Sequence, residues 1–154
     1  MRQLAYLFAI ILSLFLISCN NNPEYNLNIA PPPANSWPED IYPAQIDGIS
    51  AKTVTKDYGG TEASYGTDKS IYIARFENKQ EAIEFFKQSI LPEFEIQSSS
   101  FRGIVKDQFY ARAKEGNKKF FGWVNQRYVF VLKANSEKSF DLLVNNFKYI
   151  SKKK

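Results

Sequence analysis

The sequence contains no histidine and only one cysteine, Cys19. Histidine is the commonest general base in enzymes, the commonest zinc ligand and the usual pH-sensitive group near neutrality. Its absence excludes a serine triad, a thiol protease with a Cys–His pair and a histidine-bound zinc hydrolase. A single cysteine also excludes an internal disulfide, so the hydrophobic core must hold the domain together.

Cofactor-binding signatures are missing as well. The chain has no P-loop and no dinucleotide-binding fingerprint. It also has no loop with acidic residues at calcium-binding spacing. We therefore expect no cofactor and no metal.

Long hydrophobic runs are also scarce, and the main one lies at the N-terminus. After Met1 and Arg2, a 14-residue apolar run extends from Leu4 to Ile17 and is broken only by Ser13. A basic start, a short apolar segment and a small residue before the cleavage site are typical of a secretory signal peptide. The alternative is an uncleaved transmembrane anchor, which needs about 20 apolar residues. Here the run is too short and is soon followed by Asn20.

The residues that follow the run are Leu16-Ile17-Ser18-Cys19. They resemble the lipobox of bacterial lipoproteins. The resemblance implies that the Cys19 sulfur receives diacylglycerol and that residues 1–18 are then removed. It also implies a chain held outside the cytoplasm, because two or more acyl chains make membrane anchoring stable. Asn20 is not the aspartate that retains many lipoproteins in the inner membrane, so the outer membrane is favoured where a cell has both.

Proline and asparagine dominate the segment after Cys19, with a proline triplet at 31–33. Such composition favours extended, stiffened chain over regular helix or strand. We therefore predict three parts in the exported chain: a lipidated tether over 19–44, a globular domain over 45–151 and a basic tail over 152–154.

Hydrophobic periodicity predicts an α+β domain. A helix is expected from the Asn78 cap, with Glu81 as its capping partner, to Leu91-Pro92. A second helix is expected after Asn135 or Ser136, since the apolar residues that follow recur at three and four residues. The predicted strands cover 49–54, 63–65, 70–76, 104–105, 109–113, 119–124 and 128–134. The expected fold is an antiparallel sheet of five or six strands with two helices, in the order β-β-β-α-β meander-α.

Charge is unevenly distributed along the chain. Residues 20–99 carry 6 Lys/Arg against 12 Asp/Glu, and residues 100–154 carry 13 against 4. Basic and aromatic residues alternate in the second half, which indicates either an ordinary sheet with one basic face or a surface for an anionic, ring-bearing ligand. Exported proteins rarely meet nucleic acid, so we expect no nucleic-acid partner. The candidate binding residues are Arg102, Arg112, Lys118, Trp123, Arg127 and Tyr128.

Three functions follow from these patterns. The favoured one is a membrane-tethered envelope lipoprotein with a small non-catalytic domain that binds an envelope protein or an anionic ligand. The second is an envelope hydrolase or transferase with a Ser–Lys or carboxylate site, for which Ser98–Ser100, Glu77, Glu81 and Glu84 are the candidates. The third is a module for a lipid or another hydrophobic ligand, which requires a large apolar cavity beneath the aromatic meander at 119–134.

Overall fold

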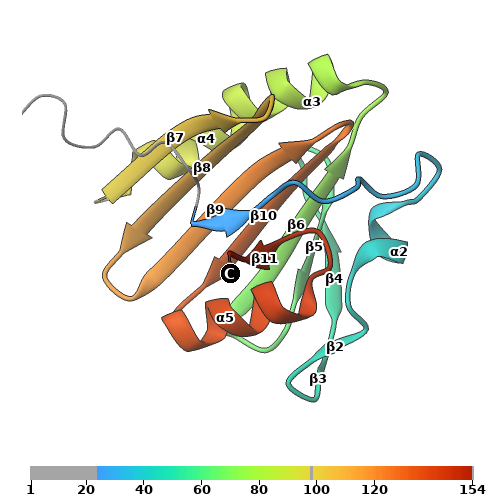
Figure 1. Ribbon diagram of the computed structural model, residues 1–154. Coiled ribbons are helices and arrows are strands. Elements are labelled where there is room, and N and C mark those ends of the chain that lie inside the picture. Colours follow the sequence, from blue (N-terminus) through green and yellow to red (C-terminus); the bar gives the residue numbers. More distant parts are fainter. Residues whose placement is uncertain (1–23, 98, 154) are drawn as a thin grey trace, which may run out of the picture.

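The computed structural model describes residues 24–97 and 99–153. The predicted signal peptide and Cys19 lie outside these residues. The described part is built on one antiparallel sheet of seven strands, in the order β4-β5-β6-β10-β9-β8-β7 (Figure 1). The strands are β4 (Lys52–Thr55), β5 (Thr61–Ser64), β6 (Lys69–Arg75), β7 (Ser99–Val105), β8 (Gln108–Glu115), β9 (Lys118–Asn125) and β10 (Tyr128–Ala134).

The α+β class with a large antiparallel sheet is confirmed, whereas the predicted number of strands is too small. The strand expected at 104–105 extends over all of β7 and forms one edge of the sheet. The segment expected as one strand at 49–54 is divided between two sheets. Its first part, β3 (Ile49–Ser50), pairs with β2 (Gln45–Ile46), and its second part is β4.

Helices cover both faces of the sheet. On one face lies a continuous helical stretch made of α3 (Lys79–Phe85), the π-helical η1 (Phe86–Ile90) and α4 (Leu91–Glu95). On the other face lies α5 (Glu137–Asn146). A strand buried on both faces has no polar side, which explains the nearly continuous apolar runs of β9 and β10.

The first helical stretch continues past Pro92, contrary to the prediction that it ends there. The Leu91 amide donates to the carbonyl of Phe86, five residues earlier, so the chain makes a wide π turn before the proline. Pro92 then occupies the first turn of α4. Proline is favoured in the first turn of a helix because its fixed φ is already helical.

The predicted tether differs most from the structure. From Glu24 onward it lies against the sheet, and its short strand β1 (Tyr25–Asn26) pairs with β11 (Ser151–Lys152). A short helix, α2 (Pro38–Ile41), follows. Tyr25 and Leu27 are at most 3% exposed and belong to the core on the α5 side. Prolines keep the regular elements of this segment short, but they do not prevent its apolar side chains from docking.

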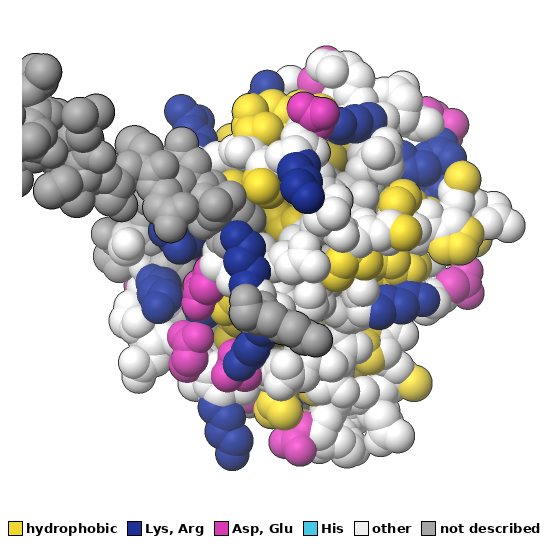
Figure 2. Space-filling model, viewed as in Figure 1, with side chains coloured by type: hydrophobic (Ala, Val, Ile, Leu, Met, Phe, Trp, Pro, Cys, Tyr) yellow, Lys and Arg dark blue, Asp and Glu magenta, His cyan; other side chains and the backbone are white. Residues whose placement is uncertain are grey.

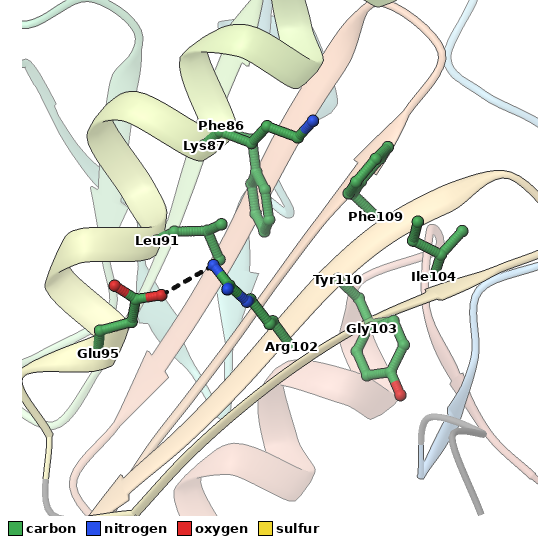
Figure 3. Close-up of a pocket in the computed structure, with 9 residues that line it drawn as sticks. All are labelled: Phe86, Lys87, Leu91, Glu95, Arg102, Gly103, Ile104, Phe109 and Tyr110. Atoms are coloured by element: carbon green, nitrogen blue, oxygen red, sulfur yellow. Dashed lines mark hydrogen bonds and ion pairs between the residues drawn. The ribbon is translucent and has the colours of Figure 1, made fainter. Parts of the chain in front are cut away.

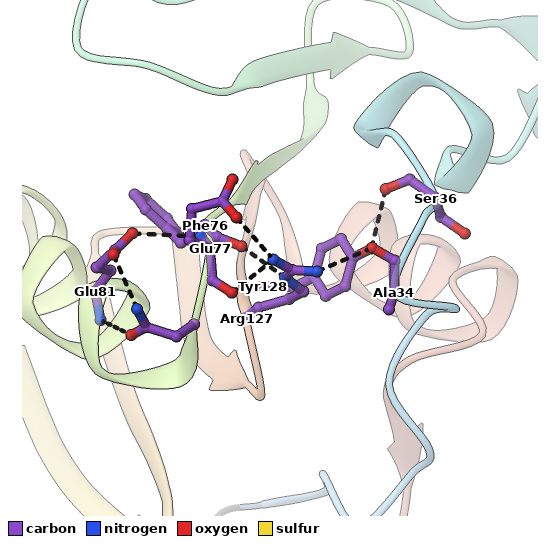
Figure 4. A network of polar contacts seen from close by, with 8 residues as sticks. Ala34, Ser36, Phe76, Glu77, Glu81, Arg127 and Tyr128 are labelled. Atoms are coloured by element: carbon purple, nitrogen blue, oxygen red, sulfur yellow. Dashed lines mark hydrogen bonds and ion pairs between the residues drawn. The ribbon is translucent and has the colours of Figure 1, made fainter.

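Polar contacts hold the middle of the same segment. The Tyr128 hydroxyl donates to the carbonyls of Pro33 and Ser36, both at 2.9 Å. The Arg127 guanidinium donates to the carbonyl of Ala34 at 3.2 Å (Figure 4). The side chain of Asn125 donates to the carbonyl of Ile29 at 2.9 Å. The segment from residue 24 to residue 44 is therefore part of the folded domain.

The predicted basic tail also differs in part. Lys152 lies in β11, and its ammonium forms an ion pair with Asp141 of α5 at 2.8 Å. Lys154 lies outside the described residues.

Candidate functional site

Two of the predicted binding residues are in the core. Trp123 and Tyr128 are both 0% exposed, and their rings pack against Phe130 with centroids 5.1 and 6.0 Å apart. They lie on the two central strands β9 and β10, whose faces are covered by helices and by the N-terminal segment. The prediction that they line a surface is therefore wrong.

Two of the predicted arginines lie on opposite faces of the sheet edge. In the pairing of β7 with β8, Phe101 stands opposite Arg112, and Arg102 stands opposite Ala111. Since neighbouring residues of a strand point to opposite faces, Arg102 and Arg112 diverge. Arg102 forms an ion pair with Glu95 of α4 at 3.1 Å, and the Arg112 guanidinium lies 5.0 Å from the Phe101 ring.

The remaining two predicted cations lie at opposite ends of the sheet. Lys118 lies at the β8–β9 turn and pairs with Glu115 at 3.6 Å. Arg127 lies at the β9–β10 turn, where it donates to the carbonyls of Phe76 and Glu77 (Figure 4). The six predicted residues therefore do not form one anion-binding surface.

The region beneath the aromatic meander is filled with side chains. Trp123 contacts both Phe121 and Phe130, with centroids 5.9 and 5.1 Å apart, and Phe147 of the segment after α5 packs on Phe130 at 5.4 Å. All four rings are at most 1% exposed. The large apolar cavity that a lipid carrier would need at this place is therefore not formed.

A buried lysine was missed by sequence reasoning. The Lys119 ammonium lies 2.8 Å from Glu137, 3.4 Å from Glu24 and 2.6 Å from the Tyr25 hydroxyl. Burial alone lowers the pKa of Lys119, but the hydrogen bonds with Glu137 and Tyr25 outweigh it and hold the pKa above its usual value. The amine thus stays protonated and does not act as a general base. Nothing in the local sequence distinguishes Lys119 from its exposed neighbour Lys118.

A serine and a lysine also meet at the start of α5, on either side of one carboxylate. The Ser139 hydroxyl donates to Asp68 at 2.5 Å, and the Lys69 ammonium lies 3.1 Å from the same carboxylate. The hydrogen bond from Ser139, reinforced by Lys69, lowers the pKa of Asp68 despite the opposing effect of burial. Ser136 caps the helix by accepting from the Ser139 amide at 3.1 Å. These contacts fix the helix start, and the lowered pKa of Asp68 makes it a weak base for the serine hydroxyl.

The other catalytic candidates have structural roles or are exposed. Asn78 accepts from the Glu81 amide at 3.0 Å, and the Glu81 carboxylate accepts from the Asn78 side chain at 2.9 Å. This pair is a variant of the predicted capping box, because Glu81 accepts from the Asn78 side chain and the Glu77 amide instead of the Asn78 amide. Glu84 accepts from Gln80 at 3.0 Å on the exposed side of α3. Ser99 and Ser100 are exposed on β7, and Ser98 lies outside the described residues.

The described residues form neither a cluster of metal ligands nor a membrane-spanning helix. Among residues 24–97 and 99–153, no three or more acidic side chains are grouped closely enough to hold a metal ion. No helix formed by these residues has the length and apolar character required to cross a membrane.

A groove at the β7 edge of the sheet combines apolar and charged side chains (Figure 3). It has a volume of 420 Å³ and lies between the η1–α4 stretch and the β7–β8 hairpin. Phe86 and Leu91 come from the helical side, and Ile104 and Phe109 come from the strands. Ile104 is 56% exposed, so its side chain is accessible to a ligand in the groove.

Charged groups lie around this apolar surface. The Lys87 ammonium stands 4.6 Å from the centre of the Phe109 ring, and Arg102 reaches across to Glu95 on α4 (Figure 3). A second hollow of 320 Å³ continues on the other side of that ion pair and shares Leu91, Glu95 and Arg102 with the groove. We call the two hollows together the α4–β7 trough. The trough lies at the edge of the sheet, because no strand among residues 24–97 and 99–153 pairs with the outer side of β7.

Gly103 helps to shape the trough. A Cβ atom on this residue would lie 2.8 Å from the Tyr110 ring, which is closer than van der Waals contact allows. The glycine therefore lets Tyr110 fold over β7 towards the α5 side of the sheet, where it stacks on Phe121. Figure 3 shows the Tyr110 ring directed away from Phe109, which is left facing the trough.

Comparison with known proteins adds information on the fold. No family model matches the chain, and no curated protein matches it. Among solved structures, it is similar to the crystal structure of a GTP binding regulator from Thermotoga maritima, with a TM-score of 0.53 and 14% sequence identity. The match covers 79% of this chain and 94% of that chain. Identity at this level shows a shared fold alone.

Proposed function

We propose that this chain is a lipid-anchored protein of the bacterial cell envelope and that its folded domain is a non-catalytic binding module. The α4–β7 trough is its binding site. The observation that carries this proposal is the trough itself, which joins an apolar surface to a few charged groups. Ligand sites in proteins have this composition and a volume of roughly 300–1,000 Å³.

The contacts of the candidate catalytic groups support binding over catalysis. Lys119 and Lys69 both pair with carboxylates, and Ser139 donates its hydroxyl proton to Asp68. A serine nucleophile needs an effective general base beside it, and Asp68 is a poor one because its pKa is lowered. The charged groups of the trough are engaged in an ion pair and in a contact between Lys87 and an aromatic ring.

The Thermotoga protein is described as a GTP binding regulator. We do not extend nucleotide binding to this chain, because it lacks the glycine-rich loop that cradles phosphates in P-loop proteins. The trough also offers a mainly apolar surface, whereas a triphosphate requires a strongly positive one.

The anchor is tested by replacing Cys19 with alanine. We expect the wild-type protein to sediment with membranes and the Cys19→Ala variant to be released from them, since the acyl chains have no other point of attachment. Fractionation followed by immunoblotting measures this. The Ser18→Ala variant is the matched control, because a small residue before the cysteine is retained. A Cys19→Ala protein that stays membrane-bound without acylation would contradict the anchor proposal.

The trough is tested by replacing Ile104 with glutamate. We expect N-phenylnaphthylamine, an uncharged dye that fluoresces in apolar sites, to bind the wild type and to bind Ile104→Glu about tenfold more weakly. Loss of a partly buried apolar contact and desolvation of a carboxylate cost about 1.4 kcal/mol together, which corresponds to that factor. Val54→Glu is the matched control, because Val54 is 53% exposed on β4 at the opposite edge of the sheet. Equal dye binding by both variants would place the site elsewhere.

A further inference from the structure

We propose that the α4–β7 trough binds a long-chain carboxylate, a fatty acid, and that its carboxylate replaces Glu95 as the partner of Arg102. This inference deepens the proposed binding function and rests on it. The ligand is a fatty acid, its carboxylate binds Arg102, and Arg102 loses its contact with Glu95 when the ligand binds.

The shape of the trough favours an elongated apolar ligand. Its two hollows, of 420 and 320 Å³, lie on either side of the Arg102–Glu95 ion pair. Leu91 contributes to both hollows, so apolar surface continues past the ion pair. When the ion pair opens, a carboxylate bound to Arg102 places its head group between the hollows. The acyl chain can then extend along Leu91 and Ile104 in the larger hollow.

The ion pair indicates which head group the ligand carries. Arg102 already binds a carboxylate, that of Glu95, through one guanidinium nitrogen at 3.1 Å. The side chains are 69% and 53% exposed, and exposed ion pairs contribute little to stability. The Glu95 carboxylate is held on α4, but a free carboxylate can align with two guanidinium nitrogens. Such a bidentate pair is stronger than a single contact.

A second cation makes the site more favourable to an anion. Lys87 extends over the Phe109 ring, which also lines the larger hollow. Lys87 and Arg102 together carry two positive charges against the single negative charge of Glu95. An anionic head group would therefore enter a site with a net charge of plus one. Its acyl chain would cover Ile104 and Leu91.

The experiment measures binding of dodecanoate by calorimetry, with dodecyl maltoside as the uncharged ligand of equal chain length. It uses the mature chain with Cys19→Ala, whose hydrophobic core lies within residues 24–153. We expect dodecanoate to bind about tenfold tighter than the maltoside, because a hydrogen-bonded charge pair to Arg102 is worth about one such factor. Arg102→Gln removes that advantage and leaves maltoside binding unchanged.

Two further variants make the test specific. Glu95→Gln removes the competing carboxylate, so we expect dodecanoate to bind about threefold tighter, in the range of an exposed ion pair. Arg112→Gln is the matched control, because this arginine lies on the same two-strand edge but on the opposite face. It is expected to change neither affinity.

The possible results distinguish a failure of the fatty-acid inference from a failure of the proposed binding function. If both ligands bind equally and Ile104→Glu weakens both, the trough holds an apolar chain and the carboxylate inference is wrong. The same conclusion follows if Glu95→Gln weakens dodecanoate binding. If neither amphiphile binds and sedimentation shows a dimer that Ile104→Glu dissociates, a second copy occupies the trough. In that case the fatty-acid inference fails while the trough remains an interaction site. If nothing binds and the chain stays monomeric, both proposals fail.

Discussion

A chain that begins at Gln45 is expected to remain unfolded, whereas a chain that begins at Glu24 is expected to fold with the stability of the longer protein. The structure places Tyr25, Leu27 and Ile41 in the main core, each at most 5% exposed. Fully burying a side chain of this size is worth about 1.5–3 kcal/mol. Three of them approach the total stability of about 5–15 kcal/mol that is usual for a domain.

Loss of the segment also leaves polar groups without partners. The Tyr128 hydroxyl loses the carbonyls of Pro33 and Ser36, and Lys119 loses Glu24 and the Tyr25 hydroxyl. A buried polar group left unpaired costs about 1–3 kcal/mol. Removal therefore destabilises the remaining domain through polar groups as well as through its core.

Circular dichroism and urea denaturation of the two shortened chains test this prediction. Cooperative unfolding of the chain from Gln45 at the midpoint of the chain from Glu24 would mean that the N-terminal segment is a tether after all.

The Phe130→Ala variant is expected to lose about 3–5 kcal/mol of its free energy of unfolding, as is usual for a large ring removed from a tight core. Phe130 is 0% exposed at the centre of β10. Its ring contacts Trp123, Phe147 and Tyr149 at centroid distances of 5.1, 5.4 and 5.5 Å. These contacts come from β9 and from the chain after α5, so the cavity cannot close by moving one element.

Urea denaturation measures this loss, with Phe101→Ala as the matched control. Phe101 carries the same ring but lies half-buried on the edge strand β7. We expect the control to lose about 1 kcal/mol. A partly exposed ring buries less apolar area on folding, so its removal costs less stability. Similar losses for the two variants would contradict a core centred on the meander.

Local patterns in the sequence predicted several elements well. The Asn78 cap with Glu81 is present, and Ser136 is the cap of α5, one of the two residues proposed for it. The meander strands fall close to their predicted ranges. Each of these features depends on residues within a few positions of one another, so a short stretch of sequence contains the interaction that stabilises it.

Other features depend on residues far apart in the chain and were missed. The π turn before Pro92 allows the helix to continue. The continued helix is stabilised because Phe94 on α4 is buried against the sheet. Lys119 is buried because Glu24 and Glu137, from both ends of the domain, meet at it. Trp123 was predicted on a surface, since a sequence does not reveal that both faces of a strand are covered.

By itself, the sequence determined the α+β class and the approximate positions of most helices and strands. Its lack of histidine excludes the chemistries that need one. The sequence also predicts the lipid anchor at Cys19, through a motif that is read locally. Only the tertiary structure decided that residues 24–44 belong to the domain and that the predicted cations lie apart. It also brought Arg102 to Glu95 at the β7 edge of the sheet. A local motif needs only its neighbours, whereas a binding site needs surfaces that meet when distant segments pack.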